Sequence, residues 1–247
     1  MQVSMLKRLT MSVGALALIS ASSAFGAITV NMENGKKIFN EGKGDVPACN
    51  SCHGTNGMGN DDMGTPRLAG QGYQFVVKQL EDFATDKRKD LTMSVMNANA
   101  KGLSPQDRMD VAAFVNAMPA VKSELSKLDE IKAGGTAVGE DHLGKILVNY
   151  GVPEKGIPAC MSCHQYNGRG AAPVYPVIGQ QKYVYLVNQL KRWRDESRAN
   201  DPMAQMRAVA KKMSDEDINN AAAYLAHAPV TTIGNSRVPE EHPPYKH

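Results

Sequence analysis

Apolar residues recur along this 247-residue chain with the three- and four-residue spacing of amphipathic helices. The clearest run extends from Phe75 to Phe83, and a second run of the same kind extends from Tyr185 to Trp193. Shorter helices are expected over about 35–40 and 143–150, each before a loop that contains glycine and proline. Few segments alternate apolar and polar residues as half-buried strands do. The pattern therefore predicts an all-α protein that needs no sheet.

Two serines mark the start of the last helix in each half of the chain. Ser104 and Ser214 each precede a first turn that contains acidic residues. A serine at this position accepts hydrogen bonds from the free backbone N–H groups of the first turn. Pro119 and Pro229 would stop the two helices, because proline cannot continue them.

The sequence contains an internal repeat. Its two copies align without gaps from Pro66 onward at an offset of 110 residues. The matched pairs include Pro66 with Pro176, Gln71 with Gln181, Tyr73 with Tyr183, Gln79 with Gln189, Arg88 with Arg198, Met93 with Met203, Met96 with Met206, and Ser104 with Ser214. Such self-similarity indicates two homologous domains, which we expect over residues 27–131 and 132–230. Each is small for a self-sufficient core, so a buried cofactor would supply apolar volume.

The first residues of the chain, 1–26, have the composition of a secretory signal peptide. Lys7 and Arg8 precede an apolar stretch over 11–19, and a run of small residues follows. Cleavage after Gly26 is preferred, although cleavage two residues earlier also satisfies the small-residue rule. The apolar stretch is shorter than the roughly 20 residues of a membrane span, and no later segment qualifies. We therefore expect a periplasmic protein with no membrane span in the mature chain.

Charge then excludes one class of partner. Removal of Lys7 and Arg8 from 28 basic residues leaves 26 against 25 acidic ones, so nucleic acid is not a natural partner. The part over 27–131 has 12 basic and 14 acidic residues, whereas the rest has 14 and 11. This asymmetry either orients the protein on a charged docking surface or is chance scatter of the charges. The C-terminal tail, 231–247, contains three prolines and one glycine and is expected to be disordered or to dock on a partner.

All four cysteines of the chain lie in two copies of one motif. Cys49-Asn50-Ser51-Cys52-His53 recurs as Cys160-Met161-Ser162-Cys163-His164. In such a motif the two thiols form thioethers with one haem, and the histidine lies beneath the iron as its proximal ligand. A thioredoxin-like pair would follow a strand, and a zinc site would have to join pairs over a hundred residues apart. The motifs therefore predict two haem c groups, attached through Cys49, Cys52, Cys160 and Cys163 and with irons bound by His53 and His164.

Methionine is available as the sixth iron ligand in both repeats. Each repeat has a pair before its last helix, Met93 with Met96 and Met203 with Met206. We favour Met96 and Met206, each eight residues before the cap serine, and Met93 and Met203 remain the alternatives. A methionine ligand makes a low-spin electron carrier, whereas an open position permits ligand binding or catalysis.

Prolines and arginines near the motifs have expected supporting roles. The backbone carbonyls of Pro66 and Pro176 would accept a hydrogen bond from the proximal histidines, and such contacts tune the iron. Arg67, Arg88 and Arg198 are candidates to pair with haem propionates.

Together these residues resemble the two-haem cytochrome c4 family across nearly the whole mature chain. The resemblance is carried by the two Pro-Ala-Cys-x-Ser-Cys-His segments, by Pro66 to Gln71 with Lys78-Gln79-Leu80, and by the Met-x-x-Met stretches leading into Leu103-Ser104 and Met213-Ser214. It implies two class I c-type cytochrome domains joined by a linker, with their haems facing one another. It also implies a shuttle of electrons to terminal oxidases.

The function expected from these observations is that of a periplasmic di-haem electron carrier in a respiratory chain, and not an enzyme. Its partners would be a quinol-oxidising reductase or dehydrogenase as donor and a terminal oxidase as acceptor. One alternative is the cytochrome subunit of a larger dehydrogenase complex. A di-haem peroxidase is a weaker alternative, because it needs one iron with an open or displaceable position and the matched methionines argue against that.

Overall fold

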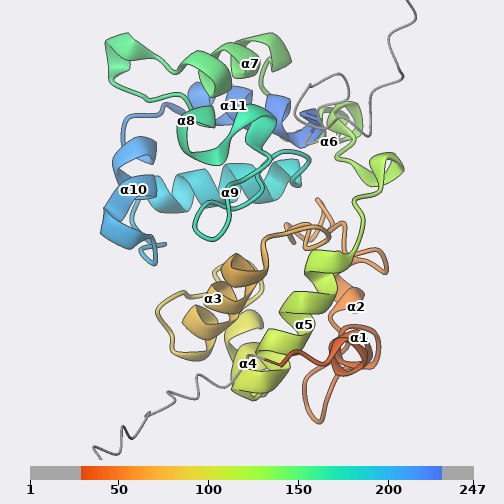
Figure 1. Cartoon of the computed structure of the whole chain (residues 1–247). Coiled ribbons are helices and arrows are strands. Elements are labelled where there is room, and N and C mark those ends of the chain that lie inside the picture. Colours follow the sequence, from red (N-terminus) through yellow and green to blue (C-terminus); the bar gives the residue numbers. More distant parts are fainter. Residues whose placement is uncertain (1–28, 230–247) are drawn as a thin grey trace, which may run out of the picture.

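The computed structural model describes residues 29–229, so the expected signal peptide and the segment over 231–247 lie outside the described residues. The described part is built from helices, turns and isolated bridges, with no strand in it, which confirms the all-α prediction. The chain forms two lobes, one from each repeat, and α3 and α9 lie on the sides that face each other (Figure 1).

The first lobe contains five α-helices around one core. They are α1 (Met32–Glu41), α2 (Asn50–His53), α3 (Tyr73–Ala84), α4 (Met96–Lys101) and α5 (Pro105–Ala117). Buried apolar residues of α1, α3 and α5, among them Phe39, Val76 and Val115, pack into this core. The helices expected from periodicity and capping are therefore present, with ends that differ by a few residues.

The second lobe repeats this arrangement. It contains α6 (Leu128–Ala133), α7 (Asp141–Tyr150), α8 (Met161–His164), α9 (Tyr183–Arg194), α10 (Gln205–Ala210) and α11 (Asp215–His227). Short 3-10 turns are η1 (Lys122–Glu124), η2 (Pro153–Lys155), η3 (Tyr166–Gly168) and η4 (Pro202–Ala204). The second core is formed mainly by α7, α9 and α11.

The expected division between residues 131 and 132 falls inside α6. Leu128 and Ile131 pack against the second core, although the expected boundary assigns them to the first domain. Ser126 also belongs to the second lobe by its contacts, because its hydroxyl accepts a hydrogen bond from the backbone N–H of Tyr183 at 2.9 Å. These contacts favour a division before Ser126.

A glycine lets two helices cross at close range in each lobe, α1 and α5 in the first and α7 and α11 in the second. A Cβ atom on Gly35 would lie 2.2 Å from the backbone oxygen of Asp110, and one on Gly144 would lie 1.9 Å from the backbone oxygen of Asn220. Real Cβ atoms do not approach so closely, so any larger residue would push the helices apart. The close crossing therefore fixes how the two helices of each lobe lie relative to each other, and these helices support the loops between them.

The caps predicted from Ser104 and Ser214 are both present. Each serine accepts a hydrogen bond from the backbone N–H three residues later, and the aspartate at that position accepts one from the backbone N–H of the serine. This reciprocal arrangement satisfies backbone donors that a helix end leaves free. It therefore fixes where α5 and α11 begin.

Candidate functional site

The two Cys-x-x-Cys-His segments form one-turn helices, α2 and α8, with a buried histidine at the end of each. His53 is 6% exposed and His164 is 7% exposed. The backbone N–H of each histidine donates to the carbonyl of the first cysteine in its motif. This single helical turn places both thiols and the imidazole of one motif on the wall of the same cavity.

Each histidine ring is held by a proline carbonyl, as the sequence predicted. The Nδ1 atom of His53 donates to the carbonyl oxygen of Pro66 at 3.0 Å, and that of His164 donates to the carbonyl oxygen of Pro176 at 2.9 Å. Burial lowers the pKa of both imidazoles, although the carbonyl contacts oppose that shift. A neutral ring with its proton on Nδ1 leaves the Nε2 lone pair free to bind a metal.

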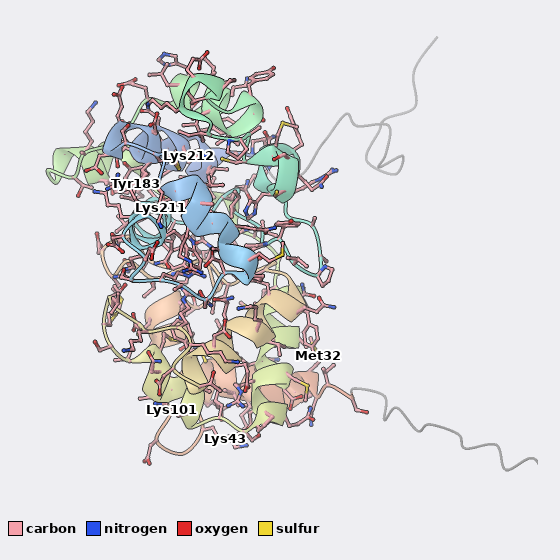
Figure 2. All side chains as sticks on the ribbon, turned by 90° about the vertical axis from the view of Figure 1, so that its left-hand side faces the viewer. Met32, Lys43, Lys101, Tyr183, Lys211 and Lys212 are labelled. Carbon is pink, nitrogen blue, oxygen red and sulfur yellow. The ribbon has the colours of Figure 1, made fainter. Side chains whose placement is uncertain are left out.

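The candidate residues of both lobes line one cavity of about 590 Å³. This lining includes every haem-attaching and iron-binding residue expected from the sequence: Cys49, Cys52, His53, Met96, Cys160, Cys163, His164 and Met206. Aliphatic and aromatic side chains from both halves form much of the remaining wall, among them Leu68, Phe83, Leu186 and Trp193. Side chains of the two lobes meet in the region between them (Figure 2).

The two candidate methionine pairs differ in their placement. Met96 and Met206 are partly buried and both line the cavity. Met203 is 86% exposed and is not part of the lining, whereas Met93 is 40% exposed and does line it. Location therefore favours Met206 over Met203, and it leaves both Met93 and Met96 within the first lobe's wall.

The cysteines lack the character of a thiol redox centre. Burial raises the pKa of the Cys49 and Cys160 thiols to about 11. A reactive cysteine needs a lowered pKa, because the thiolate is the nucleophile. In addition, the motifs form no disulfide and follow no strand in the described part of the chain.

Two arginines and two glutamines form a reciprocal network between the lobes, which we call the seam. Arg88 donates to the side-chain oxygens of Gln79 at 2.7 Å and Gln189 at 3.0 Å. Arg198 donates to those of Gln189 at 2.7 Å and Gln79 at 3.1 Å. Each guanidinium also lies over an aromatic ring of its own lobe. Arg88 donates further to the hydroxyl of Tyr185 at 3.0 Å.

The candidate arginines are buried cations that need an anion. Arg67, Arg88 and Arg198 are 2%, 7% and 8% exposed, and arginine ion pairs among the described residues involve other arginines. Burial lowers the pKa of Arg67 to about 10 and that of Arg198 to about 9. The Nε atom of Arg67 is buried without a hydrogen-bond partner. A buried charge is costly unless paired, so the carboxylates of a haem fit this wall.

Sequence reasoning missed several residues that join the lobes. Gln71 and Gln181 bind backbone groups of the opposite lobe, and Asp61 accepts a hydrogen bond from the backbone N–H of Val184 at 3.0 Å. Lys182 lies 3.8 Å from the carboxylate of Asp61. For the glutamines a signal existed, because both recur at the same place in the two repeats.

The residues thus fit two covalently attached haem groups: two motifs with neutral histidines, apolar walls and buried cations without counter-ions. Comparison with known proteins supports the same assignment of two haem groups. The family model of cytochrome c matches residues 32–119 and again residues 157–229.

Two curated relatives span most of the chain. The thiosulfate dehydrogenase electron acceptor of Stutzerimonas stutzeri is 34% identical over 196 residues, covering 78% of this chain and 86% of the relative. The cytochrome c4 of Pseudomonas aeruginosa is 32% identical over 186 residues, covering 74% of this chain and 85% of the relative.

Two solved structures share the fold. The thiosulfate dehydrogenase of Marichromatium purpuratum has a TM-score of 0.71 and 31% identity, and the match covers 81% of this chain but only 41% of that one. Reduced cytochrome c4 from Pseudomonas stutzeri has a TM-score of 0.64 and 29% identity, and the match covers 81% of this chain and all of that one. The chain therefore belongs to the cytochrome c family, as a di-haem electron carrier similar to cytochrome c4 with two covalently bound haem c groups.

Proposed function

We propose that the protein carries single electrons in the periplasm, with each iron bound by one histidine and one methionine. The first haem is attached through Cys49 and Cys52, with His53 and Met96 as iron ligands. The second is attached through Cys160 and Cys163, with His164 and Met206 as ligands. The observation that carries this proposal is that all eight side chains line one cavity between the lobes.

The chemistry supplied by a bound haem is reversible one-electron transfer at iron. The chain's own part is to hold the ligands. Burial favours the neutral form of His53 and His164, and the proline carbonyls orient the two rings, so neither ring needs to rotate or lose a proton to bind metal. Apolar residues on the wall exclude water, and Arg67, Arg88 and Arg198 supply positive charge for carboxylates.

The shared cavity also supports electron exchange within the molecule. Pro66 and Pro176, which hold the histidines, both line it, and Gln181 hydrogen bonds to the residue after Pro66. The two irons are therefore held by parts of one connected structure. We infer that the protein accepts an electron at one haem and releases it from the other.

The donor we propose is a dehydrogenase that acts on an inorganic sulfur compound, and the acceptor is a terminal oxidase. The donor proposal is supported by the relative from Stutzerimonas stutzeri, which is named as the electron acceptor of thiosulfate dehydrogenase. Among residues 29–229, no helix is long and apolar enough to cross a membrane. On this proposal the chain is a carrier and performs no substrate chemistry.

A second candidate function is that of a permanent cytochrome subunit of such a dehydrogenase. It is favoured by the Marichromatium purpuratum thiosulfate dehydrogenase, whose chain is more than twice as long as the part that matches. Copurification of a second polypeptide through gel filtration at high salt would favour this candidate over the carrier.

Optical spectroscopy tests the ligation directly. Methionine sulfur bound to ferric haem gives a weak long-wavelength absorption band, and a six-coordinate ferrous haem does not bind carbon monoxide at neutral pH. We expect the band at an intensity of two sulfur ligands per chain and no carbon monoxide adduct. A band of half that intensity, or an adduct at one haem, would refute His/Met ligation of both irons and reopen the peroxidase alternative.

A further inference from the structure

The peptide group that holds each histidine is itself held by a glutamine from the opposite lobe. The backbone N–H of Arg67 donates to the side-chain oxygen of Gln181 at 2.6 Å. In the other direction, the backbone N–H of Val177 donates to the side-chain oxygen of Gln71 at 2.8 Å. Arg67 follows Pro66 and Val177 follows Pro176, so each glutamine contacts the peptide whose carbonyl accepts a histidine proton.

The two hydrogen bonds at each site share one planar amide. The carbonyl of Pro66 and the N–H of Arg67 belong to the same resonant peptide group, as do the carbonyl of Pro176 and the N–H of Val177. A hydrogen bond donated by the N–H polarises the amide and makes its carbonyl oxygen a stronger acceptor. A stronger acceptor draws the Nδ1 proton away from the ring, which makes the imidazole a stronger electron donor to a metal.

The glutamine side chains are fixed in this orientation. Gln71 and Gln181 are each 4% exposed, so water does not compete for their amides. The Nε2 atom of Gln181 donates to the carbonyl oxygen of Arg67 at 3.1 Å, and that of Gln71 donates to the carbonyl oxygen of Val177 at 2.9 Å. Each Oε1 atom also accepts from the next backbone N–H of its own chain segment. A rotated amide would lose all of these contacts.

We propose that Gln71 and Gln181 are positioning residues that act across the lobes, each setting the reduction potential of the iron in the opposite half. The inference rests on the proposed binding of the irons by His53 and His164. Gln181 of the second lobe acts on His53 through the peptide between Pro66 and Arg67. Gln71 of the first lobe acts on His164 through the peptide between Pro176 and Val177.

The test compares two variants of the holoprotein, Gln181→Leu and Gln71→Leu, by redox titration and by NMR of the reduced state. Loss of the glutamine acceptor weakens the proline carbonyl as an acceptor, so the affected histidine donates less electron density and its haem potential rises. We expect Gln181→Leu to raise the potential of the first haem, and to make the Nδ1 proton of His53 exchange with water at least severalfold faster. Gln71→Leu should do the same to the second haem and His164.

The crossed pattern separates this effect from simple loosening of the lobes. A shift of the haem in the variant's own lobe, or equal shifts of both haems, would overturn the proposal. Gln79→Leu is the matched control, because it removes seam hydrogen bonds of the same residue type without touching either peptide. Gln79→Leu should leave unchanged the rates at which the Nδ1 protons of His53 and His164 exchange with water.

Two further measurements distinguish failure of the glutamine proposal from misfolding of a variant and from failure of the proposed ligation. If a leucine variant does not fold, Gln181→Glu and Gln71→Glu serve instead: they retain an acceptor oxygen and should retain slow exchange at the opposite histidine. Failure of the proposed ligation would be visible in the unmodified protein, as a missing methionine band. Failure of the glutamine proposal would leave that spectrum intact and the crossed pattern absent.

Discussion

The two lobes hold their histidines identically but differ in the residues that surround the cavity. Both use a proline carbonyl for the imidazole and a glutamine from the other lobe for the next N–H. By contrast, Arg67 of the first repeat corresponds to Val177, and Phe75 corresponds to Tyr185. The duplicated residues set the ligand geometry, whereas the unmatched ones set the local charge and polarity. With the proposed histidine and methionine ligands at both irons, the different electrostatic surroundings should give the two haems different reduction potentials.

The largest expected effect comes from removing the proposed methionine ligand in one lobe. Met96→Ala and Met206→Ala should each halve the methionine absorption band and open one ferrous haem to carbon monoxide, because the sixth iron position loses its sulfur. Met203→Ala is the control and should change neither the absorption band nor carbon monoxide binding, since its side chain is 86% exposed outside the cavity. Loss of the band in Met93→Ala rather than in Met96→Ala would show that the lobes use methionines at different positions of the repeat.

The next effect is on stability, at the glycines where α1 crosses α5 and where α7 crosses α11. Gly35→Ala and Gly144→Ala should each lower the free energy of unfolding by about 1–3 kcal/mol, because the added methyl group meets a backbone carbonyl. Chemical denaturation of the holoprotein measures this. Gly144→Ala should cost more, since its Cβ atom would be closer to the opposing oxygen. Gly134→Ala is the control, because its φ is −72° and the nearest atoms to an added Cβ lie at 3.5 Å.

Acid should then weaken the first lobe more than the second. Burial opposes ionisation of Asp107, yet hydrogen bonds from Lys43, Asn34 and Ser104 hold the pKa of its carboxyl far below the ordinary value. The pKa of Asp217 is lowered against the same opposition, by Lys155 and Ser214. A carboxyl with a lowered folded-state pKa stabilises the fold at neutral pH, and this contribution is lost as the pH falls below about 4.

The variant Asp107→Asn measures that contribution. It should cost about 1–2 kcal/mol at neutral pH, through loss of the cap and of the Lys43 ion pair, and it should flatten the acid dependence of unfolding. Asp217→Asn should have a smaller effect. An equal effect of the two variants at every pH would show that Asn34, which donates to Asp107 at 3.0 Å, adds nothing to the difference between lobes.

The smallest expected effect concerns the one hydroxyl that distinguishes Tyr185 from Phe75. Tyr185→Phe removes the group that accepts from Arg88 and makes the two sides of the seam more alike. The difference between the two haem potentials should therefore narrow, with little change in stability. Phe75→Tyr adds a hydroxyl at the matching position and should also narrow the difference. A larger difference between the two haem potentials in either variant would show that Tyr185 and Phe75 do not cause this difference.

The sequence predicted the elements of the fold well where local signals were strong. The capping residues, the helical periodicity and the histidine-to-proline contacts all follow from short segments or from the repeat. The partners of Gln71 and Gln181 could not be predicted, because they depend on how two complete lobes meet. For α6, the apolar residues Leu128 and Ile131 suit either core, and only the packing assigns them to the second. The choice of Met206 over Met203 likewise follows from exposure, which the repeat alone does not give.

The seam has a form that is usually found between separate molecules. Arg88 donates to Gln189, and its repeat counterpart Arg198 donates to Gln79, so the same contact occurs twice with the partners exchanged, as in a symmetric dimer. Joining the two copies in one chain makes their association independent of protein concentration. It also lets one copy change a residue while the other keeps it, which a symmetric dimer of identical chains cannot do. On the proposed function, such a difference between the copies would give the two haems different reduction potentials, and an electron that enters at one haem would then be drawn toward the other.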